Sequence, residues 1–141
     1  MPRPGTVMTQ LRAARDITQQ QLAESLGVAQ PQVSSWECGA CSPRWGRAVD
    51  YAHAIGHTIA LRDSSGTIIA TGLDIPAALA ERAERRGHKT VADARRVAFG
   101  AVYMFCVYAR SRPAVVRAST VEDYADALNC TITVHPQEEN A

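Results

Sequence analysis

The chain has 141 residues and a net charge of +1, and hydrophobic residues make up 46% of it. This length can bury one or two small cores. It contains no apolar stretch of the roughly 18–20 residues that a membrane span needs, and its N-terminus lacks a signal-peptide pattern. We therefore expect a soluble cytoplasmic protein that does not bind a membrane. Its four cysteines are expected to be thiols.

Charge is distributed unevenly along the chain. Residues 1–62 hold six Lys and Arg against four Asp and Glu, and residues 74–112 hold eight against four. From residue 113 onward, one Arg faces five acids. Two mildly basic blocks and an acidic tail favour contact with DNA over contact with a membrane.

The first predicted elements are short helices. Residues 1–5 contain two prolines and a glycine and predict a loose arm, so the first helix is expected from about Thr6 to Ala14. Thr18 and Gln21 have the spacing of a capping box, which predicts a second helix from Gln19. Gly27 can adopt the left-handed conformation that ends this helix, and a third should begin near residue 30.

The stretch from residue 18 to residue 39 separates apolar from polar side chains. Leu22 and Leu26 fall on one narrow face, and Val33 and Trp36 fall on the inner face of the following helix, so a core is expected here. The outer face of that following helix carries Gln30, Gln32, Ser34 and Ser35. Two short helices joined by a tight turn, the second apolar inside and amide-rich outside, are typical of a DNA-reading helix-turn-helix.

Residues 11–55 resemble the lambda-repressor-like (XRE-type) helix-turn-helix proteins, which include phage repressors, Cro proteins and antitoxins. The matching pieces are Leu11-Arg12, Thr18-Gln19, Leu22-Ala23, Leu26-Gly27-Val28, Val33, Trp36-Glu37, Gly39, Pro43 and Ala52 through Gly56. They cover about a third of the chain. The resemblance implies a buried ion pair between Arg12 and Glu37, and a double-stranded DNA operator as partner.

Residues of the motif divide into two expected kinds of DNA contact. The residues expected against base edges are Gln30, Pro31, Gln32 and Ser35, because they lie on or beside the outer face of the recognition helix. The residues expected to hold phosphates are Gln19, Arg15, Arg44 and Arg47, at helix N-termini and in flanking loops.

Cys38 and Cys41 are two residues apart and are followed by His53 and His57, which invites a zinc interpretation. The spacing does not suit a compact zinc finger, so we expect no metal and no cofactor. Next, Ser42 and Pro43 are expected to open another helix as its N-cap and first residue, and Gly56 to end it.

Residues 57–62 and 67–71 are rich in β-forming side chains and enclose a turn ending at Gly66, which predicts a hairpin. A lone hairpin is marginally stable, so it must lie on helices or pair with another strand. Residues 50–61 and 123–134 share six identities in twelve positions, and both read as a helix end that leads into a strand. The second half is therefore interpreted as a possible degenerate copy of the first, with its motif turn at Phe99-Gly100; chance similarity or shared packing needs are the alternative.

Three further helices are predicted in the second half. One covers 76–86, one is capped by Thr90 with Asp93, and the last is capped by Ser119 with Glu122. The copy's recognition helix would cover residues 102–110, which are almost wholly apolar and cannot read bases with side-chain amides, so a core or subunit-contact helix is expected there. A basic cluster precedes it: Arg82, Arg85, Arg86, His88, Lys89, Arg95 and Arg96. Of these, Arg85, Arg86, Lys89 and Arg96 are considered as accessory DNA contacts, against a solvated helical face.

The expected fold is mainly α. A five-helix-type helix-turn-helix domain covers residues 1–62, a β-hairpin linker covers 63–73, and a second helical domain that ends in a strand covers 74–135. Residues 136–141 are expected to be a disordered tail. The strands at 57–62 and 130–135 should share one sheet, and the second domain should serve dimerisation or accessory DNA contact.

These features predict a sequence-specific DNA-binding regulator, a repressor of phage or prophage type in the cytoplasm of a bacterial host, associated with the nucleoid. The alternative is an antitoxin whose second half binds a toxin. An enzyme is not expected, because the four histidines form no recognisable constellation with a nucleophile and no phosphate-cradling Gly loop is present. A homodimer joined through the second half is preferred to a monomer on an asymmetric site, because the apolar run 97–109 would otherwise be exposed.

Overall fold

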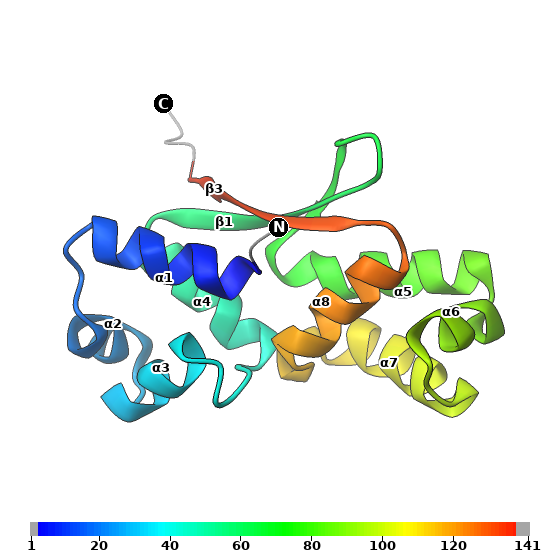
Figure 1. Ribbon diagram of the computed structural model, residues 1–141, viewed down its shortest axis with the longest axis horizontal. Coiled ribbons are helices and arrows are strands. Elements are labelled where there is room, and N and C mark those ends of the chain that lie inside the picture. The colour runs from blue at the N-terminus through cyan, green and yellow to red at the C-terminus, as the bar shows by residue number, and fades with distance from the viewer. Residues whose placement is uncertain (1–2, 138–141) are drawn as a thin grey trace.

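The computed structural model describes residues 3–137. The helices are α1 (Pro4–Ala14), α2 (Gln19–Leu26), α3 (Gln30–Glu37), α4 (Trp45–Ala54), α5 (Ile75–Arg86), α6 (His88–Arg95), α7 (Phe99–Ser111) and α8 (Ala118–Ala127). The strands are β1 (His57–Arg62), β2 (Ile68–Thr71) and β3 (Thr131–Pro136), and short 3-10 turns lie at η1 (Gly72–Asp74) and η2 (Pro113–Val115). Figure 1 shows α1–α4 on one side of the molecule, α5–α8 on the other, and the strands across both. The predicted mainly α class is confirmed, and none of the helices described has the length and apolar character of a membrane span.

The first helices follow the predicted signals closely. The capping box of α2 is complete, because the Gln21 N–H donates to the Thr18 hydroxyl and the Thr18 N–H donates to the Gln21 side chain. Gly27 ends α2 with a φ of 69°. The expected start of α1 at Thr6 is wrong, since the helix begins at Pro4, whose ring already holds a helical φ. The expected loose arm therefore does not include Pro4 and Gly5, and Met1 and Pro2 lie outside the described residues.

Three predicted helix starts are wrong. α4 begins at Trp45 after Arg44, α6 begins directly after Gly87, and α8 begins at Ala118. The hydroxyl of Ser42, expected to cap α4, accepts a hydrogen bond from the backbone N–H of Ser119 instead. Backbone contacts between the two halves therefore replace the local caps that were expected at Ser42 and Ser119. At Gly87, a φ of 93° turns the chain so sharply that α6 starts before the predicted cap at Thr90.

β1 is the central strand of a sheet with the order β2-β1-β3, and it runs antiparallel to both neighbours. The predicted hairpin is present, and the strand at the end of the second half pairs with β1 as expected. β3 includes Pro136, which had been placed in the tail, and the Gln137 N–H donates to the Gly56 carbonyl; the remaining tail residues lie outside the described range. The inward-facing Ile59 and Leu61 of β1 are fully buried against the helices.

The same order of elements, four α-helices and then a strand, occurs before and after β2: α1–α4 with β1, and α5–α8 with β3. Ala60 of β1 pairs with Thr133 of β3. These two residues occupy the same position in the similar segments 50–61 and 123–134. Ile59 pairs with Val134, while Leu61 pairs with Ile132. This crossed arrangement is what an approximate two-fold axis through the Ala60–Thr133 pair produces.

A second contact lies on the same axis. Arg44 and Arg117 form an isolated antiparallel bridge with each other. On either side of it, the Trp45 N–H donates to the carbonyl of Val116 at 2.6 Å, and the Ala118 N–H donates to the carbonyl of Pro43 at 2.9 Å. The two halves thus exchange equivalent backbone hydrogen bonds near the starts of α4 and α8.

The turn between α6 and α7 does not lie where the sequence placed it. In the first half the Val28 N–H donates to Ala23 at 3.0 Å, and in the second half the Val97 N–H donates to Ala92 at the same distance. Gly27 and Arg96 hold the left-handed position in the two turns. The expected turn at Phe99-Gly100 is wrong. α7 has 13 residues and α3 has 8, so the offset found near the C-terminus does not extend back to α6.

One hydrophobic core joins the two halves, with Trp45 and Tyr124 as its largest fully buried side chains. Leu22 and Val33 are buried as predicted, at 1% and 0% exposure. Leu26 and Trp36, which were also expected in the core, are only partly buried at its margin.

Candidate nucleic-acid interface

α3 is the helix that separates a buried from an exposed face in the first half. Val33 points into the core, while Pro31 and Gln32 are exposed and Gln30 and Ser35 are partly exposed. α3 packs mainly on α2, from which it is separated by the three residues Gly27, Val28 and Ala29. The four side chains expected against base edges thus lie on one short helix at the surface (Figure 1).

The end of α3 is fixed by a buried ion pair. The Nε and Nη2 atoms of Arg12 donate to the two carboxylate oxygens of Glu37, at 2.6 and 2.9 Å, and the two side chains are 13% and 6% exposed. Arg12 also donates to the Ile17 carbonyl in the loop before α2. Tyr51, from α4, donates its hydroxyl proton to Glu37 at 2.5 Å. Three helices of the first half, α1, α3 and α4, therefore meet at one carboxylate.

This network shifts the titration of its members. Burial alone would raise the pKa of Glu37, but hydrogen bonds from Arg12, Tyr51 and Gln19 outweigh it and hold that pKa below its usual range. Burial raises the pKa of the Tyr51 hydroxyl, and its bond to the Glu37 carboxylate raises it further. The hydrogen bond to Glu37 raises the pKa of Arg12. At neutral pH the ion pair is charged and Tyr51 is the proton donor.

Two glutamines extend the network to the surface. The Gln19 amide nitrogen donates to Glu37 at 3.0 Å, and the Gln19 amide oxygen accepts from Gln30 Nε2 at 2.7 Å. The amide of Gln30, at the start of α3, is therefore held in one orientation by a chain of contacts that leads back to Arg12. The sequence placed Gln19 among phosphate-binding residues, and it did not show this link to Gln30.

The three arginines expected at phosphates differ in their surroundings. Arg44 is exposed beside the start of α4. Arg47 donates to the carbonyl of Leu26, the last residue of α2, at 2.9 Å, so it ties α4 to α2. Arg15 lies over Gly56, where an added Cβ would stand 2.3 Å from its Nη1 atom.

Comparison with known proteins bears on this half of the chain. A scan against protein families matches residues 5–64 to a family described as a helix-turn-helix domain. Residues 5–64 are a helix-turn-helix domain. Such domains bind DNA, and in that family they are typically not enzymes. Comparison with curated proteins and with solved structures gives no match.

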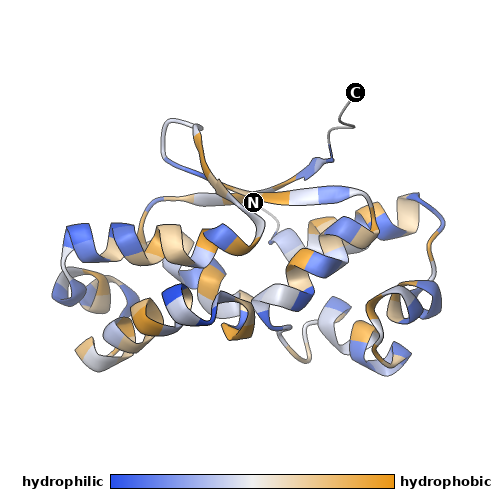
Figure 2. Ribbon diagram, turned by 180° about the vertical axis from the view of Figure 1, so that it is seen from behind, coloured by the Kyte–Doolittle hydropathy of each residue, from blue (hydrophilic) through white to orange (hydrophobic). Residues whose placement is uncertain are grey.

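α3 of the helix-turn-helix domain carries polar side chains at positions where α7 of the second half, largely hydrophobic in Figure 2, carries apolar ones. With Ala29 and Ala98 as the residues before α3 and α7, the places of Gln30, Ser34 and Ser35 are taken in α7 by Phe99, Tyr103 and Met104. The exposed large apolar side chains of α7 are Phe99, Tyr103, Met104, Val107 and Tyr108, with exposures of 39–56%. The side of α7 that corresponds to the side of α3 expected to face bases is therefore apolar and aromatic.

The basic cluster of the second half is largely engaged within the protein. Arg85 pairs with Glu81, and Arg86 donates to the carbonyl of Ala127. Arg95 pairs with Asp123 and lies 4.3 Å from the centre of the Tyr124 ring. Lys89 and Arg96, the other two residues considered for accessory DNA contact, are exposed.

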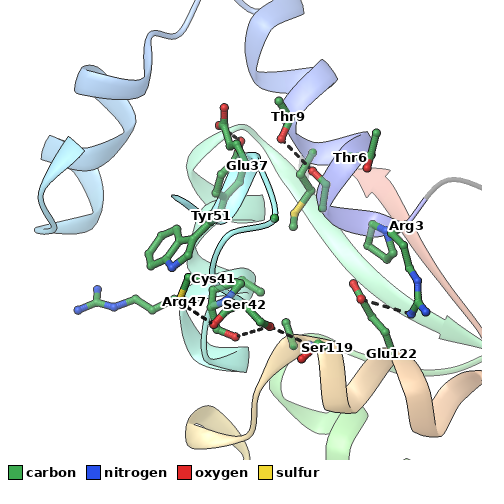
Figure 3. Close-up of a pocket in the computed structure, with 18 of the residues that line it drawn as sticks. Arg3, Thr6, Thr9, Glu37, Cys41, Ser42, Arg47, Tyr51, Ser119 and Glu122 are labelled. Atoms are coloured by element: carbon green, nitrogen blue, oxygen red, sulfur yellow. Dashed lines mark hydrogen bonds and ion pairs between the residues drawn. The ribbon is translucent and has the colours of Figure 1, made fainter. Parts of the chain in front are cut away.

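A cavity of about 380 Å³ lies where α1, α3, α4 and α8 converge. Figure 3 shows Glu37 and Tyr51 at one end of it, and Ser42, Ser119, Arg3 and Glu122 at the other. Its lining includes Trp36, which is partly exposed, and Trp45, which is buried. Because its walls come from both halves, the cavity lies at their junction and apart from the outer side of α3.

Cys38 and Cys41 are free, exposed thiols in the loop after α3. Within the described residues, the group of potential metal ligands that lies close together is a different one: Glu84, His88 and Cys106, from α5, α6 and α7. Sequence reasoning missed this group because the three residues are far apart in the chain and have no recognisable spacing. In the correct alignment of the halves, His88 takes the place of Gln19 and Cys106 takes the place of Glu37. That correspondence is the sequence signal that could have predicted the group.

Proposed function

We propose that the protein is a sequence-specific DNA-binding transcriptional regulator of the repressor type, as in phages and prophages, and that α3 reads the operator. The observation that carries this proposal is the chain of contacts from Arg12 through Glu37 and Gln19 to Gln30. It fixes an amide at the N-terminal end of the reading helix, where such helices meet base edges. Gln and Asn amides can pair with two atoms of adenine in the major groove.

The test uses the exposed Gln32. Gln32→Ala should weaken binding to a selected operator by about 1–3 kcal/mol and relax specificity at one base pair, because a side-chain amide is lost at a base edge. The matched control is Gln20→Ala, on the exposed side of α2 and bonded to Glu24, which should leave specificity unchanged. Binding would be measured to the operator and to a scrambled duplex. Equal loss on both duplexes would count against α3 as the reading helix.

We further propose that a second copy of the chain covers the apolar side of α7. One helix-turn-helix reads about half of a site, and α7 lacks amides at the corresponding positions, so one chain supplies one reading helix. Exposed apolar side chains gathered on one helix are typical of an interface. Beside them stand paired charges of both signs, Glu84 with Arg110 and Glu81 with Arg85, which allows two identical surfaces to meet without net repulsion.

Sedimentation tests this part separately. At micromolar concentration the wild-type protein should sediment at about twice 15.2 kDa, the mass of one chain. The double change Tyr103→Ser and Val107→Ser should give a monomer, while Ile68→Ser, which removes an equally exposed apolar side chain from β2, should leave the dimer intact. A wild-type protein that sediments as a single 15.2 kDa species would contradict the dimer.

The antitoxin alternative uses the same surface for a different occupant. If the wild-type protein is monomeric and a second protein co-purifies with it but not with the Tyr103→Ser, Val107→Ser variant, the second half binds that protein.

In the monomer arrangement on one asymmetric site, neutralising Arg85, Arg86, Lys89 and Arg96 together should remove most DNA binding. In the dimer arrangement it should change binding little, because Arg85 and Arg86 already have partners within the protein.

A further inference from the structure

At the places of the Arg12–Gln19–Glu37 network of the first half, the second half has three side chains of types that can bind a metal. Arg12 holds the same place in α1 as Glu84 in α5, because the residue that follows each helix donates its N–H to the carbonyls of Arg12 and Glu84, at 3.1 and 3.2 Å. Gln19 and His88 are the first residues of α2 and α6, and Glu37 and Cys106 are each the eighth residue of α3 and α7.

In the first half these places are bonded directly to one another. Arg12 and Gln19 both donate to Glu37, at 2.6 and 3.0 Å. In the second half the corresponding trio is a carboxylate, an imidazole and a thiol. Their ligand atoms all lie within 4.8 Å of one another. Zinc bonds of about 2.0–2.3 Å place ligand atoms roughly 3.5 Å apart in a tetrahedral site, a separation that small side-chain rotations would reach.

The Nε2 atom of His88 is the second observation that points to a ligand. It is buried and has no hydrogen-bond partner among the described residues. The aromatic rings of Phe99 and Tyr103 lie beside the His88 ring, with centroids 5.6 and 6.1 Å away, and shield it. A buried nitrogen without a partner is costly, and coordination of a cation would remove that cost.

We propose that Glu84, His88 and Cys106 bind a zinc ion that ties α5, α6 and α7 together. One carboxylate, one imidazole and one thiolate form a donor set that suits Zn²⁺, with water at the fourth position. On binding, the Cys106 thiol releases its proton to solvent and the thiolate sulfur donates an electron pair to the metal. Arg110 donates to both oxygens of Glu84, so Oε1 gives up its bond from Arg110 and turns to the ion, while Oε2 keeps its bond.

A direct binding measurement tests this. Protein treated with a chelator and then titrated with Zn²⁺, in competition with a chromophoric chelator, should take up one ion per chain. Cys106→Ser and His88→Gln should each weaken binding by more than about tenfold, since even the loss of a residue that supports a ligand costs about 10–100-fold. The control is the double change Cys38→Ser and Cys41→Ser, which removes the exposed pair and should leave binding unchanged. Absence of saturable binding, or its loss in the control, would overturn the proposal.

A second readout needs no variant and so does not depend on whether the variants fold. Cys106 and Cys130 are buried to the same extent, at 3% and 4% exposure, and only Cys106 belongs to the trio. Under conditions of partial unfolding, Zn²⁺ should slow alkylation of Cys106 by about tenfold more than that of Cys130, as measured by mass spectrometry of peptides. Equal protection of both thiols would contradict coordination at Cys106.

Discussion

Arg12 and Glu37 form a two-point contact, in which one guanidinium donates to both oxygens of one carboxylate and so joins α1 to the end of α3. Both side chains are nearly buried, which distinguishes this pair from the exposed Arg85–Glu81 pair of α5. Removing one member of a buried pair leaves the other charge without compensation, whereas exposed pairs contribute little.

The first prediction follows from that difference. Glu37→Gln should lower the free energy of unfolding by at least about 2 kcal/mol, because Arg12 keeps its charge and loses the carboxylate. Urea denaturation followed by circular dichroism measures it. Glu81→Gln, which breaks the exposed pair, is the control and should be indistinguishable from wild type. A Glu37→Gln protein as stable as the control would show that the pair does not stabilise the fold.

The second prediction concerns pH. The pKa of Glu37 is lowered in the folded protein, so its contribution is complete above the usual pKa of about 4.3 and is lost as pH falls toward the folded value. The difference in unfolding free energy between wild type and Glu37→Gln should therefore be constant from pH 7 to about pH 5 and shrink below about pH 4.3. A difference that grows on acidification would contradict the assigned direction.

The third prediction compares two corresponding tyrosines. Tyr51 donates to Glu37, so Tyr51→Phe should cost about 1.5–3 kcal/mol, as for a hydrogen bond to a charged group. The buried hydroxyl of Tyr124 has no partner among the described residues, and Cys106 stands where the first half has Glu37. Tyr124→Phe keeps the stack on Phe105, 3.7 Å between ring centres, and should be neutral or stabilising. Thermal melting of the two variants side by side measures the difference in stability. A similar loss of stability in both variants would contradict the prediction.

The fourth prediction concerns phosphate contact. Arg44→Ala should weaken binding to every DNA sequence and reduce the slope of log K against log salt by about one, since one phosphate contact is lost. Arg85→Ala, whose side chain already pairs with Glu81, should leave the slope unchanged. Binding would be titrated at several salt concentrations. A wild-type slope in the Arg44 variant would remove this residue from the interface.

The parts of the fold that depend on local chemistry could be predicted from sequence. The capping box at Thr18, the left-handed Gly27 and the β-hairpin all express short-range preferences of the residues involved. The ends of helices near the junction could not, because the groups that satisfy them come from the other half. The hydroxyl of Ser42 reads as a local cap, and only the folded chain brings it to Ser119.

The candidate site divides in the same way. The outer residues of α3 follow from helical periodicity, and the pairing of Arg12 with Glu37 was implied by resemblance. The link from Gln19 to Gln30 depends on the angle between two helices. The trio Glu84, His88 and Cys106 depends on how three helices pack together. Sequence patterns do not give these arrangements. The alignment of the halves through similar segments failed at α6, because α7 is longer than α3 and the extra length shifts the offset.

The pairing of β1 with β3 places both halves of a two-fold arrangement on one polypeptide. Their association is therefore unimolecular and does not depend on protein concentration, in contrast to that of two separate chains. In a symmetric homodimer every substitution appears on both subunits. Here a substitution changes one half only, so α7 can lose the amides that α3 keeps, and the two sides of one scaffold are free to acquire different ligands.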